Sequence, residues 1–282
     1  MPSSDPLALG TGPVSFGVDF ADDPRNPGWA DVLDGIAAAG YAWTELGPLG
    51  YLPAAASSAL AERGLGLTAG FVFEPLHDPA RRAATIAAAR AVAQRVAALG
   101  GRFLLAIDAV TPERARTAGR SDAARRLDRD AAARLRDTLA EIRAIADGCG
   151  LRALVHPHAG THIEFADEVE PLLDVLELCL DTGHWLYAGH DPVRAVERWA
   201  ERIPYVHLKD LDRSRLAGDF WGAVQAGAFR PLGEGDLDLR ALLGALARSG
   251  YAGWAVVEQD RTPGGDPVGD LVASRRAVEE LA

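Results

Sequence analysis

Short apolar runs alternate with longer helical stretches along the whole chain of 282 residues, and this alternation limits the fold more than any other feature. The short runs are rich in β-branched and aromatic residues, as buried strands are, whereas the Ala-, Leu- and Arg-rich stretches between them have the period of amphipathic helices. Eight strands are predicted, at residues 14–18, 41–45, 65–71, 103–107, 152–156, 176–181, 203–208 and 254–258.

Helices are predicted between these strands, and glycines end several of them, because a glycine readily adopts the left-handed conformation that closes a helix. Strand followed by helix, eight times over, is typical of a (β/α)8 TIM barrel, since an open doubly wound sheet usually has fewer units. We therefore expect one α/β domain over residues 1–282, with residues 1–12 as a flexible N-terminal arm. The predicted helices include residues 29–39, 54–63, 79–98, 130–147 and 239–248, and the closing glycines are Gly40, Gly64, Gly100 and Gly250.

Charge and composition exclude several classes of function. The chain has 40 acidic and 29 basic side chains, a net charge of −11, which disfavours binding to a phosphate backbone. Two cysteines, Cys149 and Cys179, are too few for a disulfide framework, and apolar neighbours predict that both are small buried side chains. The N-terminus has no basic region followed by an apolar run, and no stretch of about 18 apolar residues lacks a charge. A cytoplasmic protein without a membrane partner is expected.

Two segments interrupt the alternation. Residues 111–129 are rich in arginine and are predicted to form a solvated loop that leads into a helix. Residues 211–235 are too long for a bare loop between strand and helix, and they carry Phe220, Trp221 and Phe229. These aromatic side chains indicate a packed lid or a surface for a partner subunit.

Polar residues end five of the eight predicted strands. In a barrel of parallel strands the carboxyl ends meet at one mouth, where the active site lies, so these side chains are expected to converge. Carboxylates gathered there would repel one another without a cation. The residues at or just beyond the strand ends are Glu45, His156, His158, Asp181, His184, His207, Lys209 and Glu258.

A divalent metal is therefore predicted at the mouth. Mixed imidazole and carboxylate ligands suit Mn²⁺, Zn²⁺, Co²⁺ or Fe²⁺ better than Ca²⁺. The predicted ligands are His156, Asp181, His207 and Glu258, one from each of four consecutive strands. No phosphate-binding GxxxxGK[ST], dinucleotide-binding GxGxxG or GxSxG nucleophile motif competes with this reading. Lys209 is open to two interpretations, a Schiff-base lysine or a side chain that supports the ligands.

The same residues lie in motifs that resemble the xylose isomerase-like barrel superfamily, and most closely its inosose (2-keto-myo-inositol) dehydratase family. The resemblance covers about residues 40–260, and the order and spacing of the motifs are specific to that branch. The motifs are YAWTELGPLGYLP, HPHAGT, LCLDTGHWLYAGHDP, YVHLKDLD, FWGAVQAGAFRPLGEGDLDL and GYAGWAVVEQD.

The resemblance implies one divalent metal, Mn²⁺ or Co²⁺ first, with Zn²⁺, Fe²⁺ and Mg²⁺ as alternatives. Asp181, His207 and Glu258 match ligands of the superfamily, whereas His156 stands where isomerases and epimerases carry a glutamate. Inosose dehydratases have HHHMGT there, and Pro157 replaces its middle histidine. The first loop also departs from the dehydratases, because it lacks their Trp-Asn-Asp element.

A histidine in place of one glutamate is awkward for a two-base epimerase and favours elimination, so the resemblance implies a hydro-lyase. The substrate is expected to be a keto-cyclitol or other keto-polyol that loses water through a metal-stabilised enediolate. Glu258 is predicted to accept the α-proton, and His158 or Lys209 to protonate the departing hydroxyl. The predicted substrate contacts are Glu45, His184, Arg213 and Trp185, with Tyr187, Phe220 and Trp221 as further candidates for an apolar wall.

Four alternatives stay open. The nearest is an isomerase or epimerase that acts on a free or phosphorylated ketose, followed by a lyase that cleaves a 3-keto-glycoside by β-elimination. A DNA-repair nuclease of the endonuclease IV type shares the barrel but needs a trinuclear zinc site and a basic groove. A sensor without catalytic activity needs fewer polar strand ends than this chain has. Relatives are often dimers or tetramers, so a homodimer or homotetramer is also expected.

Overall fold

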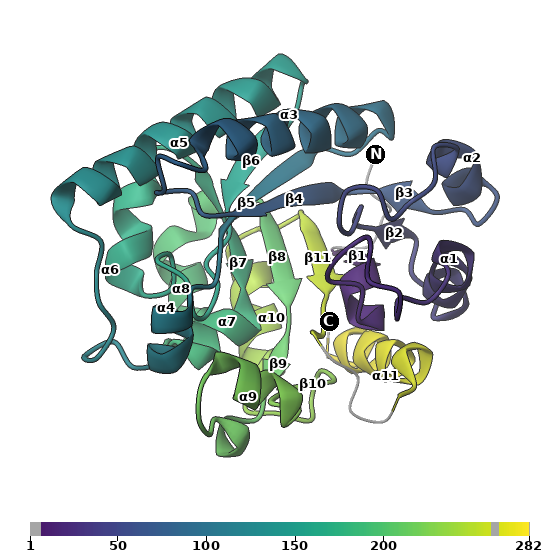
Figure 1. Cartoon of the computed structure of the whole chain (residues 1–282). Helices are drawn as coiled ribbons and strands as arrows, with labels where there is room; N and C mark the ends of the chain where they lie inside the picture. Colours follow the sequence, from purple (N-terminus) through teal and green to yellow (C-terminus); the bar gives the residue numbers. More distant parts are fainter. Residues whose placement is uncertain (1–6, 261–264, 282) are drawn as a thin grey trace.

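The structure, a computed structural model, describes residues 7–260 and 265–281 and forms a barrel of parallel strands surrounded by helices (Figure 1). Nine strands lie in the order β3-β2-β1-β11-β8-β7-β6-β5-β4. Only Thr68 separates β3 from β4, the two ends of this strand order. Its N–H donates to the carbonyl of Thr44 in β2, and its carbonyl accepts the N–H of Arg102, just before β5, so it bonds to the neighbouring strand on each side. β3 and β4 are thus two parts of one barrel strand, and the predicted (β/α)8 TIM barrel is confirmed.

The strands and helices of the barrel alternate along the chain. The barrel strands are β1 (Ala8–Thr11), β2 (Trp43–Thr44), β3 (Gly66–Leu67), β4 (Ala69–Glu74), β5 (Phe103–Asp108), β6 (Arg152–Val155), β7 (Glu177–Asp181), β8 (Tyr205–Leu208) and β11 (Trp254–Val257). The helices are α1 (Trp29–Ala38), α2 (Ala56–Ala61), α3 (Arg82–Ala98), α4 (Pro112–Thr117), α5 (Arg129–Gly148), α6 (Ala166–Val169), α7 (Thr182–Tyr187), α8 (Pro192–Trp199), α9 (Phe220–Gln225), α10 (Leu239–Arg248) and α11 (Pro267–Glu279). The four closing glycines have φ values between 67° and 85°, as predicted. No helix among the described residues is long and apolar enough to cross a membrane.

The first strand differs from the prediction. Residues 14–18 were expected to form it, but Pro13–Phe16 is a 3-10 helix, and Ala8–Thr11 is the strand that pairs with β11 and β2. Pro13 lacks the N–H that a central strand needs, so the chain turns there and the strand ends before it. Residues 8–11 are therefore not part of a flexible arm, and residues 1–6 lie outside the described residues.

Side chains that alternate along the strands fill the barrel interior, because successive residues of a strand point to opposite faces. This interior cluster consists of Ala69, Phe103, Leu105, Leu154, Cys179, Tyr205 and Val256. Cys179 is buried as predicted, whereas Cys149 at the end of α5 is only half-buried. The larger apolar core lies between the strands and the helices. The interior cluster closes the barrel below the mouth, so functional side chains lie at the carboxyl ends of the strands.

The two irregular segments both contain secondary structure. In the arginine-rich segment, α4 carries Arg114, whose side chain is fully buried instead of solvated. In the second segment, β9 (Asp210–Leu211) and β10 (Phe229–Arg230) form an antiparallel pair that encloses α9. Phe220 and Phe229 are buried there, while Trp221 is 48% exposed. The expectation of a packed lid agrees with this arrangement at the barrel mouth.

Candidate active site

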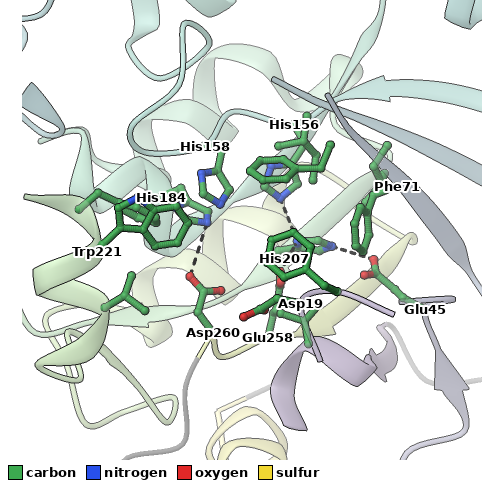
Figure 2. Close-up of a pocket in the computed structure, with 17 residues that line it drawn as sticks. Asp19, Glu45, Phe71, His156, His158, His184, His207, Trp221, Glu258 and Asp260 are labelled. Atoms are coloured by element: carbon green, nitrogen blue, oxygen red, sulfur yellow. Dashed lines mark hydrogen bonds and ion pairs between the residues drawn. The ribbon is translucent and has the colours of Figure 1, made fainter. Parts of the chain in front are cut away.

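The four predicted metal ligands converge at the mouth of the barrel, and Figure 2 shows three of them, His156, His207 and Glu258. Each lies two residues beyond a side chain of the interior cluster, so the alternation of its strand turns it inward. His207 is the central member: its Nδ1 lies 3.1 Å from His156 Nε2, 3.6 Å from Asp181 Oδ2 and 2.6 Å from Glu258 Oε2. One ligand atom from each of the four side chains lies within 4.8 Å of the others.

The donors of this cluster fit a divalent metal. Asp181 Oδ2 and Glu258 Oε2 are buried and accept no hydrogen bond from the described residues, although nitrogen atoms surround them. Burying carboxylate oxygens without such partners is costly unless a cation compensates them. Two imidazole nitrogens and two carboxylate oxygens suit a first-row divalent ion. The site is therefore suited to hold one divalent metal.

Glu45 determines which nitrogen of His207 faces the other ligands. Glu45 Oε1 lies 2.8 Å from His207 Nε2 and also accepts a hydrogen bond of 2.8 Å from the Tyr205 hydroxyl. When Nε2 carries the proton, the lone pair of Nδ1 faces Asp181 and Glu258. Carboxylates commonly orient metal-binding histidines in this way. Glu45 also lines the cavity, as its predicted substrate contact requires. Its orienting role toward His207 was not anticipated from the sequence.

Lys209 lies beneath the cavity among three carboxylates. Its Nζ lies 2.5 Å from Asp260 Oδ1, 3.4 Å from Asp181 Oδ2 and 3.5 Å from Glu258 Oε2. Burial alone would lower the pKa of Lys209, but these carboxylates outweigh it and raise the pKa. These carboxylates favour the ammonium form, which can donate a proton, over the free amine that a Schiff base requires.

His158 and His184 form a stacked pair on the cavity wall, with ring centroids 3.7 Å apart. Burial lowers the pKa of both, to about 3 for His158. His156 and Lys209 lower the pKa of His158 further, and His158 and Lys209 lower that of His184 further. His158 Nδ1 lies 2.9 Å from the Ala159 carbonyl, so it carries the proton and Nε2 is left as an acceptor. His158 is thus better placed to accept a hydrogen bond than to supply the proton predicted for it.

His184 is less available to substrate than predicted. Its Nε2 lies 3.2 Å from Lys209 Nζ, and its Nδ1 accepts a hydrogen bond of 3.4 Å from the Ala159 N–H. Both ring nitrogens therefore face donors of the protein, and the one acceptor nitrogen of the neutral imidazole is used by one of them. His184 lines the cavity and lies between Lys209, 3.2 Å from its Nε2, and the stacked ring of His158.

Two of the predicted substrate contacts lie elsewhere. Trp185 is buried and packs against His190 and Trp199, with ring centroids 4.6 Å and 5.7 Å away, and it does not line the cavity. It faces the helical layer because α7 turns it away from the strand ends. Arg213 is exposed on the 3-10 turn Arg213–Arg215, also outside the cavity lining. Neither placement favours the role predicted from sequence.

The apolar wall of the cavity comes from other aromatic side chains. Phe220 and Trp221 line it as predicted, and so do Phe71 and Phe73 from β4. Figure 2 shows Trp221 and Phe71 on opposite sides of the cavity. Tyr187 packs behind Phe220, with ring centroids 5.7 Å apart. A cavity with polar groups at its base and aromatic side chains on its walls suits a small polar ring with apolar faces.

Sequence reasoning missed two carboxylates of the cavity. Asp260 lies two residues beyond Glu258, and Asp19 lies in the first loop, and both line the cavity. Burial raises the pKa of Asp260 to about 7, although Lys209 opposes that shift. The signal for Asp260 was its place in the VVEQD motif, where the alternation that turns Glu258 inward also turns Asp260 inward. No comparable signal was present for Asp19, because a loop brings it to the mouth.

Comparison with known proteins gives one consistent family. The sequence profile of the xylose isomerase-like TIM barrel matches residues 33–280. The inosose dehydratase of Geobacillus kaustophilus is 30% identical over 279 residues, which cover 92% of this chain and 89% of that protein. Two solved structures share the fold. The IOLI protein with a binding zinc atom is 15% identical with a TM-score of 0.76, and the match covers 98% of this chain and 99% of that one. The D-allulose 3-epimerase of Methylomonas sp. is 18% identical with a TM-score of 0.75, and the match covers 100% of this chain and 99% of that one. The chain belongs to the xylose isomerase-like TIM barrel family and, within it, to the inosose dehydratases.

Proposed function

We propose that the protein is a metal-dependent hydro-lyase that removes water from a keto-cyclitol such as 2-keto-myo-inositol. The observation that carries the proposal is the cluster of His156, Asp181, His207 and Glu258 at the base of a cavity with aromatic walls. The inosose dehydratase relatives supply the substrate class. Mn²⁺ or Co²⁺ is the proposed metal, and zinc is the alternative because a neighbour of the same fold carries it.

A divalent metal, when bound by these four residues, supplies a Lewis acid that polarises the ketone and stabilises the charge on its oxygen. Glu258 is the proposed base. The Lys209 ammonium lowers the pKa of Glu258 against the effect of burial, so the carboxylate is ionised at neutral pH. It accepts the proton from the carbon next to the ketone, and the electron pair of that C–H bond moves toward the carbonyl.

The second half of the reaction needs a proton for the hydroxyl that leaves. We assign Lys209 as the source of this proton, because its ammonium group is held by carboxylates at the base of the site. Asp260 both contacts Lys209 Nζ and lines the cavity, so it can pass the proton to the substrate oxygen. The C–O bond then breaks, water leaves, and the new double bond is conjugated with the ketone. The acceptor nitrogen of His158 is proposed to bind a substrate hydroxyl.

The test measures metal and activity together. Protein stripped with a chelator and then supplied with Mn²⁺ or Co²⁺ should convert 2-keto-myo-inositol to a product with enone absorbance. Asp181→Asn should lose bound metal and at least about 100-fold in rate, because even the loss of an outer partner of a metal ligand costs about 10- to 100-fold. Full activity of the metal-free protein would overturn the proposal.

Asp238→Asn is the matched control for Asp181→Asn. Both aspartates cap a helix through Oδ1, Asp181 to the N–H of His184 and Asp238 to the N–H of Ala241, each within 2.9 Å. Asparagine retains that acceptor, so both variants should fold. Only Asp181→Asn should lose metal and rate. An equal loss in both variants would indicate a folding effect instead of a ligand effect.

An epimerase is the second candidate, because D-allulose 3-epimerase shares the fold. Incubation with a ketose such as D-allulose in deuterated water distinguishes the two reactions. Deuterium incorporation at the carbon next to the ketone, without loss of water, would favour the epimerase. Loss of water from the keto-cyclitol favours the lyase, and His156 in place of a second glutamate base is the residue that supports this outcome.

A further inference from the structure

A second cluster of potential metal ligands lies outside the site described above. It consists of His77, Asp108 and His162, and one ligand atom from each lies within 4.8 Å of the other two. Asp108 is the last residue of β5, His77 lies in the loop between β4 and α3, and His162 lies in the loop between β6 and α6. Three neighbouring loops of the barrel mouth therefore meet at this cluster.

The distances suit a small divalent ion. His77 Nδ1 lies 3.7 Å from Asp108 Oδ1, and His162 Nδ1 lies 3.3 Å from Asp108 Oδ2. Zinc bound to nitrogen and oxygen at about 2.0 to 2.1 Å in a tetrahedron separates its ligands by about 3.3 to 3.4 Å. Both imidazoles turn the same nitrogen, Nδ1, toward the carboxylate. Both nitrogen–oxygen distances therefore lie within a few tenths of an ångström of this separation, and one ligand atom from each of the three side chains lies within 4.8 Å of the others.

Backbone contacts hold the three side chains in this arrangement. Asp108 accepts the N–H of Leu76 at Oδ1 and the N–H of His162 at Oδ2, each at 3.0 Å. Arg134 on α5 donates to the His77 carbonyl at 3.2 Å. The Asp108 carboxylate is fully buried; Oδ1 has a second lone-pair direction for a ligand, and that of Oδ2 faces His162 Nδ1.

Hydrogen bonding within the cluster leaves the buried Nδ1 of His77 without a partner among the described residues. His162 Nδ1, in contrast, pairs with Asp108 Oδ2. The two rings meet edge to face, with centroids 4.5 Å apart, and one ligand atom from each ring lies within 4.8 Å of the other and of a carboxylate oxygen of Asp108. A cation bound by these atoms would satisfy both nitrogens and the carboxylate together.

We propose that His77, Asp108 and His162 bind a second divalent metal ion of the zinc class, with water as a fourth ligand. Two imidazoles and one carboxylate with one open position are a ligand set typical of Zn²⁺. The ion links the loops that follow β4, β5 and β6. Phe73, Ile107 and His158 of these same segments line the substrate cavity, so the ion stabilises that side of the cavity wall.

The test counts metal ions and does not depend on the proposed reaction. Protein without an affinity tag is stripped with a chelator, loaded with Zn²⁺ or Co²⁺, dialysed and analysed by mass spectrometry for metal per chain. The wild type should hold two equivalents, and Asp181→Asn should retain the one at the second cluster. The double variant His77→Gln/His162→Gln should lose that equivalent, with binding weakened at least about 100-fold, since even an outer partner is worth about 10- to 100-fold.

His190→Gln is the matched control, because His190 also lies in a loop, between α7 and α8, and accepts a hydrogen bond from Ala166 N–H, but belongs to neither cluster. It should retain both equivalents. If the double variant does not fold, the single variant His77→Gln, which removes the imidazole without a hydrogen-bond partner at Nδ1, should likewise lower the count from two equivalents to one. A wild type that holds one equivalent only, or a second equivalent that persists in the double variant, would overturn the proposal.

Discussion

Replacement of Arg114 by methionine tests the buried ion pair that supports the loop after β6. The Arg114 side chain is fully buried, and its guanidinium donates to Glu164 Oε2 at 3.2 Å and to both oxygens of Glu168 at 2.7 and 3.0 Å. Glu164 in turn accepts the N–H of Gly160, in the loop that carries His158. Methionine fills much of the same volume but removes the positive charge and its hydrogen bonds.

The expected loss follows from the charge left behind. Removal of one partner from a buried ion pair costs about 3 to 5 kcal/mol, because the remaining charge is uncompensated. Glu164 retains the N–H of Gly119, and Glu168 retains the N–H of Phe165, which favours the lower end of that range. An unfolding entropy of about 2.1 cal/mol/K per residue over 282 residues converts 3 kcal/mol into a decrease of about 5 °C in Tm.

The assay is thermal unfolding at pH 8, with Arg152→Met as the matched control. Arg152 also makes a bidentate pair, with Glu177, but its side chain is 54% exposed. Exposed pairs contribute about 0 to 1 kcal/mol, so the control should lose less than about 2 °C. Equal decreases in the two variants would refute the reasoning, since Arg114 is fully buried between two carboxylates and Arg152 is an exposed partner of one.

The pH dependence of stability provides a second test of the same network. Burial raises the pKa of Glu164 to about 7 against the effects of Arg114 and two N–H donors. The folded state therefore holds a proton that the unfolded state releases near pH 4.5, so this stability is present below pH 4.5 and is lost as the pH rises through about 7. Glu164→Gln removes the titration. The Tm of the wild type should fall relative to this variant between pH 5 and pH 8, and a rise would contradict the assignment.

Three further predictions concern single side chains. Cys179 is buried, which raises the pKa of its thiol, whereas Cys149 is half-buried. A thiol reagent should therefore modify only Cys149 in the native protein and both cysteines after denaturation. Rapid modification of both in the native state would contradict this. Trp221→Ala removes a half-exposed part of the cavity wall, so steady-state kinetics should give a KM raised several-fold and a kcat within about twofold, whereas a loss in kcat alone would argue against a binding role. Gly183→Ala would place a Cβ 2.6 Å from Lys209 Cγ, so it should cost about 1 to 3 kcal/mol of stability and reduce kcat; an unchanged Tm and rate would show that Lys209 can shift freely.

The local pattern was informative wherever a feature depends on strand alternation. His156, Asp181, His207 and Glu258 were predicted as one cluster, and their ligand atoms lie within 4.8 Å of one another. The prediction needed only the strand ends, because parallel strands of a barrel share one mouth. It failed for residues 14–18, where Pro13 ends the strand earlier than the apolar run suggests.

Contacts between distant segments were not predictable in the same way. Glu45 orients His207 across 162 positions in sequence, and Arg114 was interpreted as solvated although it pairs with Glu164 and Glu168, 50 and 54 positions away. Trp185 follows Asp181 closely but faces the helical layer. Each case depends on the direction of a side chain relative to a segment that folds against it.

The sequence by itself determined the barrel, the faces of its strands and therefore the ligand cluster at the mouth, because alternation along a strand is a local property with a period of two residues. Tertiary structure alone decided the hydrogen-bond partners: which nitrogen of His207 faces the ligands, why Lys209 is an ammonium ion, and how His77, Asp108 and His162 meet. These contacts depend on loop paths and on burial. Burial also determines their strength, since charges and hydrogen bonds interact far more strongly away from water than at the surface.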